Sequence, residues 1–396
     1  MKRVISIVLC IFFLTLLPGC WNRKELNSLA VLQAVGIDKT EDGQIRLSAQ
    51  ILLPSAVRTG KSDTSGGNKG VWVVTAEGET VFDAFRNSTL ISSRKLFLSH
   101  NKVIVISETL AKEGLGDVMD LFNRDHEFRK LPYVFVTKGK AEEIISGEHE
   151  QEKITAKALE SLAKTTFATS KIAKVRVFDL DKNLVSKTND PIIPGIEIVQ
   201  VKKEKQIKDI VKLDGTAIFK SDKLVSWLDG RETRGALWVL NEVKSGIIVV
   251  SAPEGETKKV SIEIMKASSR IVPKIEEGTL KVNVNIQAEG NLAEQMSEAN
   301  LAKMDTLSKL ETKMSSAISD EIQAAIVKAQ KWDTDIFKFG EDFHRKFPKE
   351  WPELEKNWDQ EFEKIEVSVF VDAKLRRTGV LSNPIMYNRV KGEESE

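Results

Sequence analysis

Apolar and polar residues alternate in three segments of the last third of the chain. Successive side chains of a β-strand point to opposite faces, so this alternation predicts strands with one buried and one exposed face. The three segments therefore predict an antiparallel sheet that is covered on one side only. The alternating apolar positions are Val260, Ile262 and Ile264, then Val282, Val284, Ile286 and Ala288, and finally Ile365, Val367, Val369 and Val371.

A helical pattern separates the second and third of these strands. Asn291 is expected to cap the helix, with Glu294 as its capping-box partner. Apolar residues then recur every three or four positions, and a straight helix from Leu292 to Lys331 would be about 60 Å long. Because the spacing is not a regular heptad, we expect this helix to lie across the sheet rather than in a coiled coil. Two shorter helices should follow, the second beginning near Pro352.

Strand and helix patterns alternate in the first half of the chain, which is typical of an α/β layered domain. Leu29–Asp38 and Gln44–Leu53 flank a turn-rich stretch and predict a β-hairpin. Further strands are expected at residues 71–76, 102–106 and 133–137. Helices are expected at residues 79–91, in the segment that ends at Phe122, and at residues 141–145 and 154–167.

Pro191 and Pro194 mark a break in the pattern. Short strands at residues 211–219, 224–228 and 246–251, with a helix at 232–241, follow it. The fold class is therefore mixed α/β (α+β), with several domains whose sheets are flanked by helices. The predicted division is a signal peptide at 1–19, an N-terminal α/β domain at 20–200, a small middle α/β domain at 201–256, a C-terminal α/β domain with the long helix at 257–385, and a polar tail at 386–396.

The first twenty residues have the layout of a secretory signal peptide, with charged, apolar and small residues in that order. Leu17-Pro18-Gly19-Cys20 closes the segment and resembles a bacterial lipobox, in which Cys20 becomes the first residue and carries a diacylglycerol and an N-acyl chain. The alternative is an uncleaved transmembrane anchor. The apolar run is only about 14 residues long, whereas a spanning helix needs roughly 20.

Composition excludes several classes of function. The net charge of +1 gives no bulk attraction to nucleic acid. The cysteines are Cys10, in the segment that would be removed, and Cys20, which would be alkylated. The mature protein would therefore have no disulfide, no catalytic thiol and no thiolate metal site.

No recognised catalytic pattern occurs in the sequence. His126-Glu127 is not followed by the second histidine of a zinc-protease motif, and no nucleophile elbow or phosphate-binding glycine loop is found. The sequence Glu148-His149-Glu150 could bind a metal loosely, although a solvated charged loop is the simpler interpretation. We therefore expect neither enzymatic activity nor a metal site.

Aromatic residues are dense between residues 332 and 362. They could line a ligand groove or a partner interface. Core packing between the helices and the sheet is the simpler prediction. These residues are Trp332, Phe337, Phe339, Phe343, Phe347, Trp351, Trp358 and Phe362.

A set of short motifs, in this order and spacing, resembles the Ger(x)C family, the C-subunit lipoproteins of spore germinant receptors. Lys338 stands where that family more often has glycine. The motifs are Gly19–Leu26, Ala34–Asp38, Ser99–Ile106, Leu121–Arg129, Leu213–Phe219 with Lys223–Val225, Asp335–Gly340 and Arg377–Gly379.

The resemblance implies a lipid-anchored, non-catalytic subunit on the outer face of the inner spore membrane. Its implied partners are two membrane subunits, A and B, and the complex would start germination in response to nutrients. The implied fold is three α/β domains. Cys20 would be the tether to the bilayer. Arg124, Asp125, Glu127 and Arg129 are candidates for an interface or a buried ion network.

A lipid-anchored solute-binding protein of an ABC transporter is the alternative, because that class shares the lipobox, the length and α/β domains. It would normally have two similar parallel-sheet lobes with a cleft at the strand switch point. The alternating strands and the long helix of the last third fit this architecture poorly.

Overall fold

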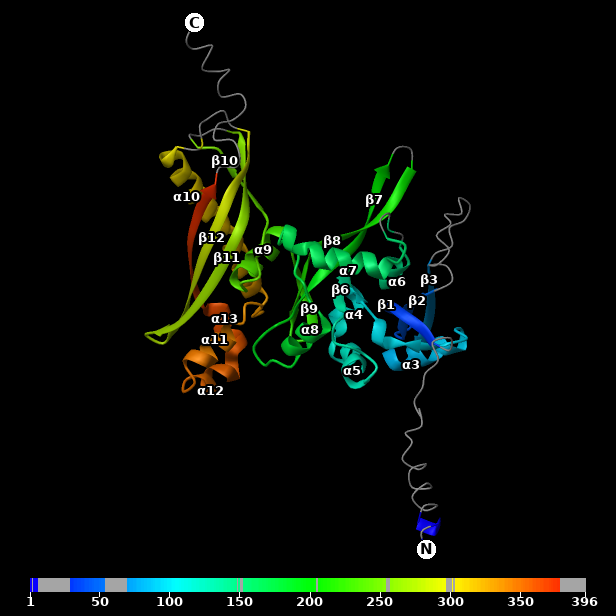
Figure 1. Ribbon diagram of the computed structural model, residues 1–396. Coiled ribbons are helices and arrows are strands. Elements are labelled where there is room, and N and C mark those ends of the chain that lie inside the picture. Colours follow the sequence, from blue (N-terminus) through cyan, green and yellow to red (C-terminus); the bar gives the residue numbers. More distant parts are fainter. Residues whose placement is uncertain are drawn as a thin grey trace.

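The computed structural model describes residues 1, 3–5, 29–53, 70–147, 149, 152–203, 206–253, 257–296, 301 and 303–377. Within these residues the strands form one sheet of nine strands and one of four. The two sheets lie side by side, and helices of the C-terminal half extend below the smaller one (Figure 1). The expected mixed α/β class, with sheets flanked by helices, is confirmed.

The larger sheet is parallel in its centre and antiparallel at its flanks. Its order is β3 (Val71–Gly78), β2 (Ile45–Leu52), β1 (Leu29–Lys39), β5 (Val103–Ser107), β6 (Tyr133–Thr137), β7 (Ile192–Lys203), β8 (Gln206–Lys220) and β9 (Lys223–Leu228), and β4 (Lys95–Phe97) also pairs with β1. β5 and β6 are buried along their whole length. Parallel strands covered on both faces require such uninterrupted apolar sequences.

Helices cover both faces of this sheet. Ile144 and Leu159, from α6 and α7, pack with Val105 and Phe135 on one face, while the helices of the other face belong to the main core cluster. The helical elements are α3 (Val81–Asn87), η2 (Ser88–Leu90), η3 (Leu98–His100), α4 (Glu108–Glu113), α5 (Gly116–Arg124), α6 (Ala141–Ser146), α7 (Thr155–Thr165), η4 (Thr166–Ala168) and α8 (Val177–Leu184).

Two expectations for this region are corrected. The single helix ending at Phe122 is two helices, because Gly114 adopts a φ of +142° at the end of α4. The prolines do not interrupt the pattern of strands. β7 begins at Ile192 and continues through Pro194, and its pairing with β8 shifts register between Pro194 and Ile196. Bulges of this kind accommodate the missing N–H of proline in a strand.

The segment of residues 201–256 contributes to both sheets. β8 and β9 extend the larger sheet, α9 (Gly230–Val239) follows, and β10 (Ile247–Ser251) joins the smaller sheet. The implied three-domain arrangement therefore appears as two sheets, since the middle strands pair with their neighbours. The domain boundaries at 200/201 and 256/257 stay predictions.

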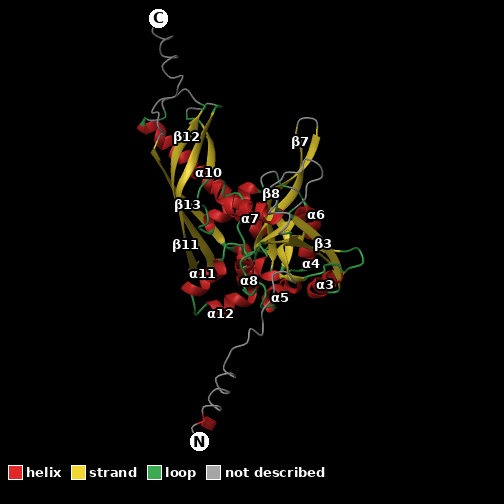
Figure 2. Cartoon of the chain, turned by 45° about the vertical axis from the view of Figure 1, so that its right-hand side comes forward, coloured by secondary structure: helices red, strands yellow, loops and turns green. Residues whose placement is uncertain are grey.

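The smaller sheet has the order β10, β11 (Lys259–Glu276), β12 (Thr279–Gln295) and β13 (Glu366–Arg377). The long helix α10 (Met304–Lys331) lies along one face (Figure 2). The buried alternating positions, such as Ile262 and Val284, face it as expected. The sheet is antiparallel from β10 to β12, but β13 is parallel to β12. The reason is the helical crossover between them, which returns the chain to the same end of the sheet.

The predicted start of the long helix is wrong. Asn291, Leu292 and Glu294 lie in β12, and α10 begins at Met304. Its 28 residues span about 42 Å. The alternation of buried residues from Val282 to Ala288 continues to Leu292. These residues therefore pair with β11 as a strand, although the apolar spacing from Leu292 onward also fits a helix.

Three shorter helices follow α10, where two were expected. They are α11 (Phe339–Lys346), α12 (Trp351–Leu354) and α13 (Trp358–Lys364), with η5 (Glu355–Asn357) between the last two. Pro352 lies in the first turn of α12, as expected. Core packing of the aromatic segment is confirmed for its buried members, whereas Trp332 is 40% exposed. The buried members are Phe337, Phe339, Phe343, Trp351, Trp358 and Phe362.

Candidate functional site at the junction of the two sheets

Two loops meet between the sheets, one leading from α8 to β7 and one leading from α10 to α11. The main-chain N–H of Asp190 donates to the carbonyl oxygen of Asp335 at 3.1 Å. The N–H of Asp335 donates in return to Oδ2 of Asp190 at 2.9 Å. Oδ1 of Asp190 also accepts the N–H of Ser221, in the turn between β8 and β9. A carboxylate from the first half of the chain therefore fixes two other loops.

The carboxylate of Asp335 organises the start of α11. It accepts the main-chain N–H groups of Phe339 at 3.0 Å and Gly340 at 2.8 Å, and the indole N–H of Trp358 at 3.1 Å. The side chain is buried, and this burial, with some help from the charge of Asp190, raises its pKa to about 7. The three donors oppose the shift, because each of them stabilises the ionised form.

A lysine lies beside this pair of carboxyl groups. Nζ of Lys220 is 2.6 Å from Oδ1 of Asp359 and 3.9 Å from Oδ2 of Asp190, and it donates to the carbonyl oxygen of Asp333. Burial raises the pKa of Asp190, whereas the charge of Lys220 acts in the opposite direction. The junction thus holds a buried acid, Asp335, with a pKa raised to about 7, and Lys220 lies beside its neighbour Asp190.

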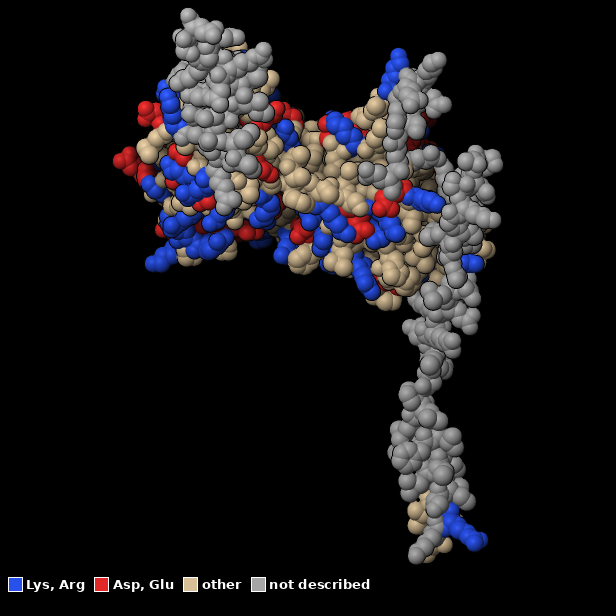
Figure 3. Space-filling view, turned by 45° about the horizontal axis from the view of Figure 1, so that its top comes forward, with Lys and Arg blue, Asp and Glu red and all other residues tan. Residues whose placement is uncertain are grey.

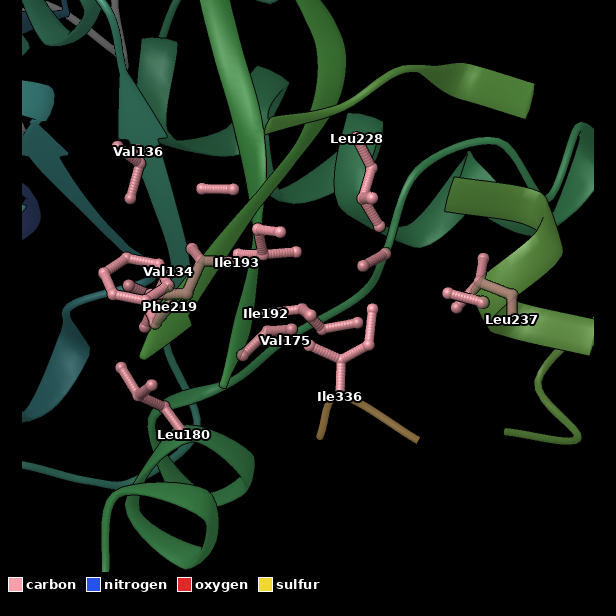
Figure 4. Packing of buried hydrophobic residues seen from close by; sticks show 14 of the residues in the cluster. Val134, Val136, Val175, Leu180, Ile192, Ile193, Phe219, Leu228, Leu237 and Ile336 are labelled. Carbon is pink, nitrogen blue, oxygen red and sulfur yellow. The ribbon is translucent and has the colours of Figure 1, made fainter. Parts of the chain in front are cut away.

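The Asp335–Gly340 motif is explained by its backbone. Lys338 has a φ of +66°, a backbone conformation that favours glycine. This explains why glycine is the commoner residue at this position of the motif. At Gly340, a Cβ atom would lie 2.7 Å from Cβ of Thr188. Ile336, the second residue of the motif, packs with Ile192 and Val175 of the N-terminal half (Figure 4). The motif therefore builds the contact between the two sheets.

A buried ion pair joins α9 to α10 within the C-terminal half of the chain. Nε of Arg234, on α9, donates to Oε2 of Glu321, on α10, at 2.8 Å, and a second bond joins Nη2 to Oε1. Oε2 also accepts the indole N–H of Trp238 at 3.1 Å, and Nη1 of Arg234 donates to the carbonyl oxygen of Ile247 at 2.9 Å. Bidentate pairs with further hydrogen bonds are the form in which buried charges are tolerated.

Local sequence explains how α9 reaches this position. Asp229 caps the helix through the N–H groups of Arg231 and Glu232, and Glu232 completes the capping box. At Gly235, a Cβ atom would lie 2.0 Å from the carbonyl oxygen of Glu321. Sequence reasoning missed Arg234 and Glu321, because the two residues are 87 positions apart on ordinary helices. The only local signal was a glycine inside a helix.

The four residues singled out from the sequence lie at the end of α5 and in the loop after it. Arg124 pairs with Asp120 of its own helix, and Asp125 accepts the N–H of Glu127 at 2.8 Å. Glu127 pairs with Lys95 at 3.3 Å, and Arg129 is exposed. Their role as an interface or network stays a proposal, and Cys20 lies outside the described residues.

The comparisons with known proteins match both halves of the chain. Residues 22–198 match the family model described as "Spore germination protein N-terminal domain", and residues 214–379 match "Spore germination B3/ GerAC like, C-terminal". The chain belongs to the spore germination B3/GerAC family. The predicted resemblance is thereby confirmed.

Individual members of the B3/GerAC family align along nearly the whole chain. "Spore germination protein KC" of Bacillus subtilis is 31% identical, with 98% of both chains covered. "Spore germination protein B3" of the same organism is 25% identical over 96% of this chain and all of that protein. A solved structure, "Crystal Structure of the GerBC protein", has a TM-score of 0.53 and 20% identity, and covers 86% of this chain and 96% of that chain. The last match supports the fold.

The junction joins the two matched segments of this family member. Asp190 belongs to the N-terminal match, whereas Asp335, Arg234 and Glu321 belong to the C-terminal match. Among the described residues, no group of three or more metal-binding side chains occurs. No helix in this part of the chain has both the length and the hydrophobicity needed to cross a bilayer.

An open hollow also lies beside the β7–β8 hairpin. It measures about 1280 Å³ and is lined by α6, α7 and both strands, with Glu143, Glu152 and Asp209 among its polar residues. Burial lowers the pKa of His149 at its rim. On the face shown in Figure 3, cationic and anionic side chains are interspersed rather than gathered by sign.

Proposed function

We propose that this chain is the lipid-anchored subunit of a spore germinant receptor complex and is required for nutrient-triggered germination. The observation that carries the proposal is the match of both halves to the germination family, in a chain that also has a lipobox-like Leu17–Cys20 segment. Its partners would be the membrane-spanning A and B subunits, on the extracytoplasmic face of the inner spore membrane.

The role of Cys20 is to confine the protein near these partners. Each buried CH₂ of an acyl chain contributes about 0.8 kcal/mol, so two or three chains hold a protein on a bilayer almost permanently. Confinement raises the effective concentration of one partner for another without any new contact. The protein would then act by binding its neighbours rather than by chemistry.

The junction supports a non-catalytic role. The carboxylate of Asp335 is buried and occupied by three N–H donors, and that of Asp190 is occupied by two. Carboxyl groups whose oxygens already accept main-chain and indole N–H groups hold loops together, which is a structural role. The solute-binding alternative is disfavoured by the sheets themselves, because a nine-stranded and a four-stranded sheet do not form two similar lobes.

Germination of spores across a nutrient panel tests the proposal. Spores of the wild type, a deletion strain, a Cys20→Ala strain and a Cys10→Ala strain are compared. Cys10 is the matched control, because it lies in the segment that would be removed. We expect deletion to abolish the response to one class of nutrient, Cys20→Ala to reproduce much of that loss, and Cys10→Ala to respond normally.

A deletion strain that responds normally to every nutrient, in a background without related genes, would contradict the proposed role. Detergent-phase partitioning of the protein and the mass of its N-terminal peptide separately test lipidation. Unmodified Cys20 would contradict the anchor and leave the receptor role to be decided by the deletion.

A further inference from the structure

The parallel strands of the larger sheet all begin at one edge, and the chain enters the fold there. Leu29, the first residue of β1, pairs with Lys95 of β4. Val103 of β5 lies opposite Ala34, five residues farther along β1, and pairs with Tyr133, the first residue of β6. The segments that precede β4, β6 and α8 therefore gather at the same edge as Leu29. We call residues 90–95, 125–131 and 174–178 the tether edge.

These three segments contact one another. Lys95 pairs with Glu127 at 3.3 Å, and Oγ of Ser99 donates to the carbonyl oxygen of Glu127 at 2.8 Å. The N–H of Phe178 donates to the carbonyl oxygen of Lys130 at 3.0 Å. The loop of residues 125–131 thus links the segment before β4 to the start of α8, and the tether edge is one continuous surface.

Large apolar side chains of the tether edge are exposed to solvent. Leu90 is 85% exposed, Leu131 59%, Ile91 56% and Phe178 49%. Single exposed apolar residues are common on protein surfaces and need no explanation. Four of them on one edge, mixed with cations, are typical of surfaces that lie in a membrane interface.

The tether edge is also strongly basic. Its three segments contain six Lys or Arg residues and two Asp or Glu residues, a net charge of +4 in a chain whose total is +1. Lys95 pairs with Glu127, and Lys130 pairs with Asp181 of α8. Lys130, Lys174 and Arg176 line an open hollow of about 410 Å³ together with Leu131, Phe178 and Asp179. Cations beside exposed apolar groups fit a phosphate headgroup and the first part of its acyl chains.

The covalent tether limits which surface can reach the bilayer. Nine residue steps separate Cys20 from Leu29, so a fully extended tether spans at most about 32 Å. Leu29 must therefore lie within about this distance of the bilayer surface. The tether edge, where Leu29 enters the fold, is within it.

We infer that the tether edge docks on the surface of an anionic bilayer, with Leu90, Ile91, Leu131 and Phe178 in the interface and the basic residues on lipid phosphates. The inference rests on the proposed lipidation of Cys20. Docking would hold the larger sheet against the membrane. Arg129, one of the candidates from the sequence, belongs to this surface.

Site-specific labelling of the lipidated full chain in vesicles tests the inference. Leu90→Cys and Leu131→Cys place a polarity-sensitive fluorophore on the tether edge, and Val249→Cys, 57% exposed on β10, is the matched control. The vesicles contain phosphatidylcholine alone or with phosphatidylglycerol, and nitroxide lipids serve as quenchers. We expect at least about twofold quenching of the two edge labels in anionic vesicles, and none at residue 249.

Charge reversal separates docking from attachment. Arg129→Glu combined with Lys174→Glu should abolish the quenching of the Leu131→Cys label, whereas Lys266→Glu combined with Arg270→Glu, on the exposed side of β11, should not. Flotation with the vesicles should be the same for all variants, because the lipid holds each of them.

The failures of the two proposals are distinguishable. Unmodified Cys20 and loss of flotation would contradict the proposed lipid anchor. A floating, lipidated protein whose edge labels remain as water-exposed as the label at residue 249 would overturn docking alone. Equal quenching in neutral and anionic vesicles would overturn the recognition of anionic headgroups.

Discussion

Asp190 and Asp335 are joined by two hydrogen bonds of opposite direction, although 145 residues separate them. Each residue is in a loop, and each loop belongs to a different half of the chain. The bond from the N–H of Asp335 ends on a carboxylate that also fixes Ser221. The position of the smaller sheet relative to the larger one therefore depends on a few buried polar groups as well as on apolar packing.

Replacement of Asp335 by alanine should destabilise the protein by about 2–4 kcal/mol, because it leaves three buried N–H donors without their acceptor. Chemical denaturation of the purified protein measures the free energy of unfolding. Asp333→Asn is the matched control, since residue 333 is exposed and asparagine tolerates its φ of +50°. Equal stability of the two variants would contradict the role assigned to the Asp335 carboxylate.

The same carboxyl group should make stability depend on pH. Burial raises the pKa of Asp335 to about 7 from an ordinary 3.8, so between these values the folded protein holds a proton that the unfolded chain has released. Its contribution is complete below about pH 4 and is lost as the pH rises through 7. We expect the free energy of unfolding to fall by up to about 2 kcal/mol between pH 5 and pH 7.

Asp335→Asn isolates this effect, because asparagine does not titrate. The difference in unfolding free energy between wild type and Asp335→Asn should vary over pH 5–7. Asp190, whose pKa is also raised by burial, remains in both proteins, but its charge acts on Asp335, so the difference reports the titration of the coupled pair. A difference that is constant with pH would show that Asp335 is ionised throughout.

The crossing of α9 and α10 should be sensitive to one methyl group. Gly235→Ala would place a Cβ atom 2.0 Å from the carbonyl oxygen of Glu321, so the helices must separate. Overpacking of this kind costs about 1–3 kcal/mol or more. Gly230→Ala, at the start of α9, is the control, because its nearest neighbouring atom would be 3.4 Å away. Thermal unfolding of both variants checks the prediction.

Loss of either partner of the Arg234–Glu321 pair should be costly, because a charge then stays buried alone. Glu321→Leu should destabilise the protein by about 3–5 kcal/mol, and the combined change with Arg234→Met should recover much of this loss. Asp320→Leu, at an exposed position on the same helix, provides the control. Additive effects of the two single changes in a double-mutant cycle would argue against the pairing.

The elements that the sequence predicted well are those with a local physical signal. The alternation around Val282 and Val284 identifies a half-buried strand without knowledge of its partners, and the apolar run of β5 identifies a strand buried on both faces. Each of these signals operates over fewer than ten residues.

The missed features depend on contacts distant in sequence. Leu292 fits both a strand and a helix, and only its pairing with Ile262 of β11 decides the choice. Pro194 lies in a strand because the neighbouring strands accept a bulge there. The Arg234–Glu321 pair joins two helices whose crossing no local pattern reveals. Contacts between segments distant in sequence therefore decided the structure where the local sequence was compatible with more than one.

The indole of Trp358 provides a final test of the junction. Trp358→Phe keeps an aromatic ring beside Trp351 and Phe343, whose ring centroids lie 5.3 and 5.7 Å away, but removes the N–H that donates to Asp335. The loss of this bond should cost about 1–2 kcal/mol. It should also raise the pKa of Asp335 further, because the donor stabilises the ionised carboxylate.

The pH dependence of stability should therefore move to higher pH in Trp358→Phe than in the wild type. Unfolding measured at half-unit steps from pH 5 to pH 8.5 would show the fall in stability at a higher midpoint. Trp351→Phe removes a comparable volume from the same cluster. Within the part of the chain that the structure describes, the indole of Trp351 makes no hydrogen bond to Asp335, so the midpoint of this variant should be unchanged. Identical midpoints in both variants would mean that the Trp358 indole does not govern the charge of Asp335.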